Sequence, residues 1–390
     1  MPPSTKPLLA VYVAFHPSFG RGEAIAEHLK AHLRRDLFDS VAGGTGLSVL
    51  FRSVPAHGSD LPLPIDETEA SVSAVVALAD VETVRDPAWR GYIAGLSAQA
   101  EETGLGLRVL PVSFDATTLD LVPENAIRVD QWTGDEPALL DRLVTEIVFE
   151  LCRMLRHYLE HLRRPLDPMS ELDRYLQPVR VFISHSKHDA VGEPIAKRVR
   201  ARLHEGRGLS SFFDVHDIPA GLRSEQVLLH RVSQSAVIAI HTDTYSSREW
   251  CRREIIEAKR ANVPLVVANC IGDRDERGFP YMGNVPIVRV DPDSNDRLDA
   301  IIARLLDEVL KDFLWKCRVQ SVSDYTADVV FLPRPPELIS LASLPPTTEM
   351  PAPLVVYPDP PLSREEERLF EAVAPHVRLR SMTEWLAEAE

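Results

Sequence analysis

Apolar and polar residues follow one pattern twice along the chain. A short β-rich run at residues 8–15 (LLAVYVAF) precedes a stretch, residues 22–33, in which apolar side chains recur every four positions. The same order returns at residues 179–184 (VRVFIS) and in the segment that follows, where Ile195, Val199 and Leu203 keep that spacing. Because four-residue spacing marks one face of an α-helix, both regions are predicted to open with a strand and an amphipathic helix.

The two regions also match residue by residue. The segment VYVAFHPSFGRGEAIAEHLKAHL, which begins at Val11, aligns without gaps with VFISHSKHDAVGEPIAKRVRARL, which begins at Val181. The similarity resumes in three later places, at Ser71 and Ser233, at Trp89 and Trp250, and at Ile127 and Val288. We infer that the chain contains an internal duplication.

Each copy is predicted to end in a long amphipathic helix, at about residues 138–162 in the first and 296–317 in the second. The fold class expected from these patterns is α/β. The chain is expected to divide into a first α/β domain (1–165), a linker (166–178), a second α/β domain (179–318), a proline-rich extended connection (319–353) and a small C-terminal α/β unit (354–390).

The C-terminal unit is predicted from three local signals. Residues 354–357 (LVVY) are strand-like, and Ser363 with Glu366 fits a capping box at the start of a helix. Ser381 with Glu384 fits a second capping box. No function follows from these signals.

Composition and charge narrow the class of protein. With 390 residues, of which 45% are hydrophobic and 26% charged, the chain is expected to fold around sizeable cores. The net charge of -15 repels nucleic acids and anionic membranes, so we expect neither as a direct partner. No apolar run approaches the roughly 18 residues of a membrane span, and no secretory cleavage pattern appears, which favours a cytoplasmic protein.

The four cysteines stand singly in the sequence. Cys152, Cys251, Cys270 and Cys317 show neither C-x-x-C spacing nor histidines in ligand register. They therefore indicate no disulfide framework and no metal site, and buried or inert thiols are expected.

The second copy contains three specific motifs, FISHS, FFDVHDIPAG and W-C-x-x-E, within about residues 179–318. On these motifs the region resembles a known family, the prokaryotic TIR (Toll/interleukin-1 receptor) domain. The resemblance implies a flavodoxin-like parallel sheet with ligands bound at the carboxyl ends of the strands. With the duplication, the fold class becomes two flavodoxin-like, TIR-type domains in tandem plus a small C-terminal extension.

In TIR domains that cleave NAD⁺, the glutamate of W-C-x-x-E is catalytic, and the resemblance places that role on Glu254. Cleavage of the bond between nicotinamide and ribose passes through an oxocarbenium-like ribose, which one nearby carboxylate can stabilise. Nicotinamide leaves as a neutral molecule from a pyridinium, so no second residue needs to protonate it. NAD⁺ would be the substrate, and no cofactor is implied.

Helical spacing places Trp250 and Glu254 one turn apart on the same face, where an aromatic surface and a carboxylate could meet one ligand. The alternative is that Trp250 is a core anchor and Glu254 an exposed acid beside Arg252 and Arg253. Spacing alone favours that alternative, whereas the family resemblance favours a catalytic role.

Further substrate contacts are expected around the same sheet edge. The residues selected are Ser184, His185, Ser186, Lys187, Phe213, Asp214, Ile218, Gly221, Arg223 and Trp250. His185 could be taken for a general base, but a lone histidine at a strand end is more often a structural hydrogen-bonder, so only binding is assigned to it. Residues 216–221 (HDIPAG) match the family's BB loop, which covers the pocket and mediates TIR–TIR contacts. Arg223 could meet the phosphates of a dinucleotide.

The first copy differs at the position that catalysis would need. Alignment of Trp89 with Trp250 places Ile93 opposite Glu254. We therefore interpret residues 1–165 as a degenerate TIR-like domain kept for assembly, regulation or partner binding. If the alignment slips here, Asp86 or Glu82 could serve instead. No glycine-rich phosphate loop appears in the sequence.

The leading hypothesis is an NAD⁺ nucleosidase that yields nicotinamide and ADP-ribose or a cyclic variant. The family resemblance implies a bacterial anti-phage effector, activated when it self-associates through TIR–TIR contacts, with a sensor from a neighbouring gene as a possible partner. One alternative is a non-enzymatic adaptor in which Glu254 is incidental. Another is a different N-glycoside transfer, such as base exchange or attachment of ADP-ribose to another acceptor.

Overall fold

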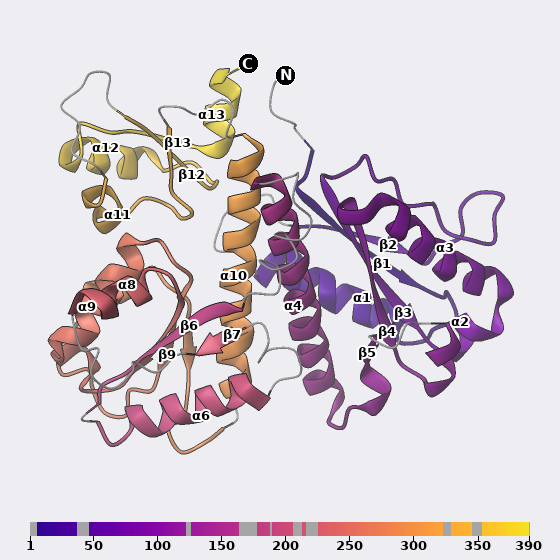
Figure 1. The fold of residues 1–390 in the computed structure, drawn as a ribbon, viewed down its shortest axis with the longest axis horizontal. Coiled ribbons are helices and arrows are strands. Elements are labelled where there is room, and N and C mark those ends of the chain that lie inside the picture. The colour runs from indigo at the N-terminus through magenta and orange to yellow at the C-terminus, as the bar shows by residue number, and fades with distance from the viewer. Residues whose placement is uncertain are drawn as a thin grey trace. The chain divides into compact units, whose positions relative to one another are not determined.

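The computed structural model describes residues 6–36, 47–121, 126–163, 178–187, 189–205, 213–215, 225–295, 297–322, 329–344 and 353–389. The chain forms two compact units (Figure 1). The first consists mainly of Met1–Arg163, and the second of Arg164–Val319 with Ser323–Ala389. The predicted linker lies outside the described residues up to residue 177.

The first unit is built on a five-stranded sheet in which all neighbouring strands are parallel. Its strands are β1 (Leu9–Phe15), β2 (Ser48–Arg52), β3 (Val72–Ala79), β4 (Leu107–Ser113) and β5 (Ile127–Arg128), in the order β2-β1-β3-β4-β5. Every residue of β1 and β3 is buried. This explains their near-continuous apolar sequences, since central strands of a parallel sheet are covered on both faces.

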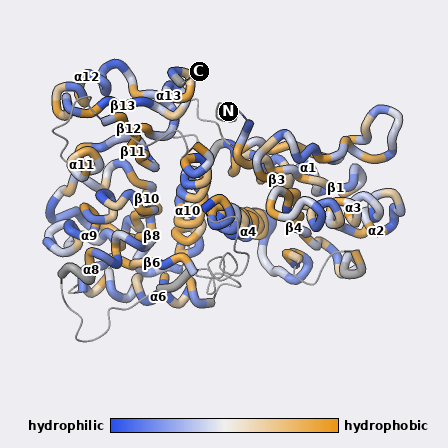
Figure 2. The backbone as a smooth tube through the Cα atoms, turned by 45° about the horizontal axis from the view of Figure 1, so that its top comes forward, coloured by the Kyte–Doolittle hydropathy of each residue, from blue (hydrophilic) through white to orange (hydrophobic). Residues whose placement is uncertain are grey.

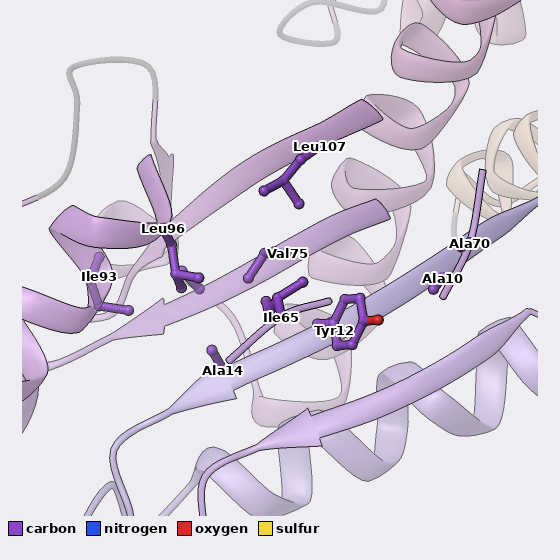
Figure 3. Packing of buried hydrophobic residues seen from close by; sticks show 10 residues of the cluster. Ala10, Tyr12, Ala14, Ile65, Ala70, Val75, Ile93, Leu96 and Leu107 are labelled. Atoms are coloured by element: carbon purple, nitrogen blue, oxygen red, sulfur yellow. The ribbon is translucent and has the colours of Figure 1, made fainter. Parts of the chain in front are cut away.

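The α-helices of the first unit are α1 (Gly22–Ala31), α2 (Val81–Arg85), α3 (Pro87–Thr103) and α4 (Glu136–Arg163). It also has a short π-helix, η1 (His32–Asp36), and the 3-10 helices η2 (Gly104–Gly106), η3 (Ala116–Asp120) and η4 (Val129–Gln131). Asp86 starts α3, because its side chain accepts hydrogen bonds from the backbone N–H of Ala88 and Trp89. Ile93 of α3 and Ala14 of β1 belong to one apolar cluster, shown in Figure 3.

The second unit contains a second five-stranded parallel sheet. Its strands are β6 (Val179–Ser184), β7 (Phe213–Val215), β8 (Ala236–His241), β9 (Leu265–Asn269) and β10 (Ile287–Arg289), in the order β10-β9-β8-β6-β7. Read from the β7 edge, and with β6 counted as the first strand, this order is 2-1-3-4-5. The first sheet has the same order when β1 is counted as its first strand. It is also the flavodoxin-like order, so the predicted fold class is confirmed.

The helices of this region are α6 (Gly192–Glu205), α8 (Glu225–Val232), α9 (Glu249–Arg260) and α10 (Leu298–Ser321), with turns η5 (Tyr245–Ser247) and η6 (Pro280–Met282). The periodic residues Ile195, Val199 and Leu203 are fully buried, which confirms the face predicted from their spacing. Figure 2 shows hydrophobic and hydrophilic positions alternating along α4 and α10, the two predicted closing helices. Helix α10 continues to Ser321, past the predicted end at Cys317.

A third, three-stranded parallel sheet follows in the same unit. Its elements are β11 (Val329–Phe331), α11 (Leu338–Ala342), β12 (Leu354–Tyr357), α12 (Arg364–Val373), β13 (Arg378–Ser381) and α13 (Met382–Ala389), with strand order β11-β12-β13. Both predicted capping boxes are present, because the backbone N–H groups of Glu366 and Glu384 donate to Ser363 and Ser381. The expectation of an extended connection does not hold for β11 and α11, because Pro333, Pro335 and Pro336 fall between them.

The small sheet is tied to α9 and α10. The Lys259 ammonium of α9 lies 2.7 Å from a carboxylate oxygen of Glu337, and Arg334 donates to the carbonyl oxygen of Val263 at 2.7 Å. On α10, the ring of Trp315 packs edge-on against Phe331, with ring centroids 6.3 Å apart. Within the described ranges, no helix is long and apolar enough to cross a membrane.

Candidate functional site

Glu254 lies in the second turn of α9, and its side chain is buried, with the residue only 8% exposed. The Ser184 hydroxyl, at the last residue of β6, donates a hydrogen bond of 2.5 Å to Oε2 of Glu254. Burial raises the pKa of Glu254 to about 7, against the opposing effects of the Ser184 bond and the positive charge of Lys187. The alternative that Glu254 is one more exposed acid is therefore wrong.

A third residue completes this group. Tyr245 of η5 is fully buried, and its hydroxyl lies 2.5 Å from the Ser184 hydroxyl oxygen. Sequence reasoning missed Tyr245. The polar segment HTDTYSSRE has no periodicity that would predict burial of its tyrosine, so only the structure shows that this hydroxyl has a partner.

The loops at the carboxyl ends of the strands are bonded to one another. Asp189, after β6, accepts hydrogen bonds from the hydroxyls of Thr242 and Thr244, which follow β8. Asp243 in turn accepts from the backbone N–H of Gly272, after β9, at 2.8 Å. These bonds fix three loops at the sheet edge where parallel α/β sheets bind ligands.

The four residues selected after β6 have different surroundings. The Ser184 hydroxyl is engaged by Glu254 and Tyr245, whereas the buried Ser186 hydroxyl has no hydrogen-bond partner among the described residues. His185 Nδ1 lies 3.3 Å from the carbonyl oxygen of Ile183, and burial lowers the pKa of its ring. That environment suits a neutral structural histidine. Lys187 is exposed.

Trp250 and Glu254 share a helix face but not an environment. Trp250 is 45% exposed, and the Arg253 guanidinium lies 4.8 Å from the centre of its ring, within cation–π range. The alternative that Trp250 is a core anchor is therefore wrong. An exposed aromatic ring beside a cation is a surface on which a ligand or another protein can stack.

The remaining selected residues are only partly placed. Phe213 and Asp214 lie in β7, paired with Val179 and Arg180 of β6. Ile218, Gly221 and Arg223 lie outside the described residues, as does the whole predicted BB loop.

The first unit has apolar side chains at the matching positions. Ile93, opposite Glu254 in the alignment, is 2% exposed, and Ala14, opposite Ser184, is fully buried. The two acids considered as substitutes have other contacts. Asp86 caps α3 and lies 3.4 Å from His16, and Glu82 forms an ion pair with Arg85 at 2.9 Å.

Metal-binding and thiol chemistry find little support. In the described part of the chain, no group of three or more His, Cys, Asp and Glu side chains could hold a metal ion. All four cysteines are free and buried. Burial raises the pKa of both Cys251 and Cys270 to about 12, so these thiols stay protonated at neutral pH.

The fold and the buried carboxyl define a flavodoxin-like α/β domain with a polar group at the carboxyl end of its first strand. The family model described as "TIR domain" matches residues 181–306 of this chain. Residues 181–306, within the second copy, thus form a TIR domain. The match does not extend to the first copy, whose descent from a TIR domain stays a prediction.

Other comparisons add no function. No curated protein matches the chain. Among solved structures, the glycotransferase of kitacinnamycin is 12% identical over 81% of this chain and 96% of its own, with a TM-score of 0.20. A putative phosphosugar isomerase from Silicibacter pomeroyi is 10% identical over 82% of this chain and 87% of its own, with a TM-score of 0.19. Neither likeness bears on the fold or the activity.

Proposed function

We propose that the TIR domain is an NAD⁺ nucleosidase in which Glu254 is the catalytic carboxylate. The observation that carries the proposal is the buried carboxyl of Glu254, bonded to Ser184 at the carboxyl end of β6, within a domain of a family that includes NAD⁺-cleaving members. Buried acids on α10 are offset by ion pairs, such as that of Glu308 with Lys311. The hydrogen-bond donor to Glu254 is instead an uncharged hydroxyl, so its charge is less well offset.

The chemistry requires the ionised form of Glu254. The bond between ribose C1′ and the pyridinium nitrogen breaks, and its electron pair leaves with neutral nicotinamide. The ribose then carries the positive charge that a carboxylate stabilises. Water, or a nitrogen of the adenine in a cyclic product, forms the new bond to C1′ and releases one proton. The positive charge of the bound pyridinium itself favours ionisation of Glu254.

Neighbouring side chains suit an anionic, aromatic substrate. Lys187 is an exposed cation close enough to Glu254 to affect its ionisation, and it could also meet a phosphate. The exposed ring of Trp250 offers a stacking surface. We assign both to substrate binding, with Glu254 alone in the chemical step.

Glu254→Gln tests the proposal, with Glu257→Gln as its matched control one turn further along α9. Each protein is assembled at high concentration with a crowding agent, and nicotinamide release from NAD⁺ is followed by chromatography. We expect Glu254→Gln to lose at least about 100-fold in rate, the scale of a lost electrostatic contact to the transition state, and Glu257→Gln to match wild type. Equal turnover by wild type and Glu254→Gln would remove Glu254 from the mechanism.

We also propose that the domain self-associates and that assembly activates it in a bacterial defence role. Support comes from the TIR family itself and from large apolar side chains exposed on this domain, such as Ile287 on edge strand β10, which is 55% exposed. The same exposed residues also suit the adaptor hypothesis. A wild-type protein that assembles yet leaves NAD⁺ intact would favour the adaptor.

A further inference from the structure

Three buried side chains from three elements form one chain of hydrogen bonds. Ser184 has a single hydroxyl proton, and the 2.5 Å bond directs it to Glu254 Oε2. The Tyr245 hydroxyl, also 2.5 Å from Ser184, must then be the donor in the other bond. The protons therefore point from Tyr245 through Ser184 to Glu254, which is the arrangement that favours an ionised carboxyl group.

The first unit lacks all three members of this chain at once. The gap-free alignment places Ala14 opposite Ser184, and Ile93 stands opposite Glu254. Tyr245 falls opposite Thr83 with the offset of the Ser71–Ser233 match and opposite Val84 with that of the Trp89–Trp250 match. The Thr83 hydroxyl instead bonds Asp80 at the start of α2. A scaffold with the same strand order therefore forms without this hydroxyl chain, so the fold itself does not require it.

We propose that Tyr245 is a positioning residue for Glu254. Tyr245 acts by orienting the Ser184 hydroxyl toward the Glu254 carboxylate. This inference rests on the proposed catalytic role of Glu254. Tyr245 itself is fully buried behind Ser184, so it is assigned no contact with the substrate. Its role is to keep the single proton of Ser184 on the Glu254 side and so to stabilise the carboxylate that the reaction uses.

Other charged or titratable groups act on this carboxyl as well. Lys187, after β6, lowers the pKa of Glu254 through its charge. Burial raises the pKa values of Cys251 on α9 and of Tyr245, and the Glu254 charge raises both further. His241 of β8 packs edge-on against the Tyr245 ring, with ring centroids 5.7 Å apart. Removal of the Tyr245 hydroxyl leaves these groups in place, so its effect can be isolated.

The test is a double-mutant cycle of Tyr245→Phe and Ser184→Ala, read on the Glu254 carboxyl itself. Glutamate labelled with ¹³C at the side-chain carboxyl is titrated by NMR in the full chain, and the Glu254 signal is assigned by its loss in Glu254→Gln. Ser184→Ala removes the donor to the carboxylate, so we expect at least about a tenfold gain in the proton affinity of Glu254. Tyr245→Phe is expected to give a gain of about threefold.

The energetic coupling between Tyr245 and Ser184 distinguishes a positioning role of Tyr245 from a merely structural one. In the Ser184→Ala background, Tyr245→Phe should change the proton affinity of Glu254 by less than about twofold, because the path between them is already broken. Tyr281→Phe, a change at a partly exposed tyrosine of the same domain, should leave the titration unchanged. The pH dependence of NAD⁺ cleavage should move in parallel with the titration.

Difluorotyrosine at position 245 serves as a second variant that keeps the shape of the side chain. Its hydroxyl is a stronger donor, so the proton affinity of Glu254 should fall. An unchanged Glu254 titration in Tyr245→Phe and in the difluorotyrosine protein would overturn the proposal, as would an equal Tyr245→Phe effect with and without Ser184. Because the NMR titration needs no turnover, an absence of NAD⁺ cleavage would count against the proposed function alone.

Discussion

The first α/β unit and the TIR domain share a strand order but fill the same place in different ways. At the end of the first strand and on the facing helix, the first unit has Ala14 and Ile93 in an apolar core, where the TIR domain has Ser184 and Glu254. The apolar pair needs only close packing. The polar pair comes with a third residue, Tyr245, because a buried carboxyl is unfavourable without hydrogen bonds.

Trp89 and Trp250, which match in the alignment, also differ in their surroundings. Trp89 is 1% exposed and packs edge-on against His16, with ring centroids 5.4 Å apart. Trp250 is exposed and stacks with Arg253. The first unit therefore uses its tryptophan for stability, whereas the TIR domain leaves its tryptophan available for contact with a ligand or another protein. Substitutions at the matching positions test this difference.

Ile93→Glu should have the largest effect, because it places a carboxyl in the first unit without its hydroxyl partners. We expect a loss of about 5 kcal/mol in local stability at pH 8 and a smaller loss at pH 5, where the carboxyl is protonated. Hydrogen exchange of β1 and β3 in the intact chain measures this, with Ile93→Met as the control. A loss below about 1 kcal/mol would show that this site tolerates an acid without those partners.

Trp89→Ala and Trp250→Ala form a matched pair. Removal of the buried Trp89 ring should cost about 4 kcal/mol, because it leaves a large cavity. Removal of the exposed Trp250 ring should cost less than about 1 kcal/mol in stability and should instead raise the KM for NAD⁺. Hydrogen exchange and steady-state kinetics measure the two effects. Equal losses of stability in Trp89→Ala and Trp250→Ala would contradict the proposed difference between a buried, stabilising ring and an exposed one.

Glu254→Gln should stabilise the TIR domain at high pH. The folded-state pKa of about 7 lies above the ordinary glutamate pKa of 4.5, so the native state binds more protons than the unfolded state between these values. The stability of the wild-type domain therefore falls as pH rises from about 4.5 to 7. Above pH 7, Glu254→Gln should be about 3 kcal/mol more stable than wild type, whereas at pH 4.5 the two proteins should differ little. Hydrogen exchange of β6 and β8 measures the gain. A gain in stability that did not depend on pH would contradict the raised pKa of Glu254.

The rate of NAD⁺ cleavage should rise with pH. If the carboxylate form of Glu254 is required and its pKa is about 7, the rate at pH 6 should be about tenfold below the plateau reached above pH 8. Initial rates from pH 5.5 to 8.5 at NAD⁺ concentrations well below KM, which report the free enzyme, give the profile. A rate that fell with rising pH would instead indicate that Glu254 acts as an acid.

Glu337→Gln should give the smallest effect, and only in the TIR domain. It weakens the contact between the small C-terminal sheet and Lys259, whose side chain is largely buried on α9. We expect a loss of about 1 kcal/mol, since the contact is partly open to solvent. Faster hydrogen exchange should appear in α9 and not in α3 of the first unit. Equal changes in both helices would point to a general loss of stability.

Much of the fold could be predicted from local patterns. The buried faces of α1 and α6, the closing helices and the capping boxes at Ser363 and Ser381 follow from spacing and residue type. The small sheet was only partly predicted. β11 has just three residues and is followed by prolines, so its strand character depends on pairing with β12 rather than on its own sequence.

The site was predicted less completely than the fold. The family resemblance selected Glu254 and Ser184, but their mutual hydrogen bond joins residues 70 positions apart. Tyr245 could not be linked to either one from spacing, because it lies in a short turn between β8 and α9 rather than on a periodic element. The assignment of His185 to binding rather than to base catalysis stays a prediction, and its ring lies 3.3 Å from the Ile183 carbonyl oxygen of the preceding strand.

The sequence by itself determined the repeated strand and helix pattern, the TIR resemblance and the choice of Glu254. Only the tertiary structure decided which of two residues on one helix face is buried. Four-residue spacing fixes the angle of Trp250 and Glu254 around the axis of α9, and it is silent on which part of that face another element covers. Burial of Glu254 against β6 and η5, with Trp250 exposed one turn earlier, sets the pKa and the bonds on which the proposed chemistry depends.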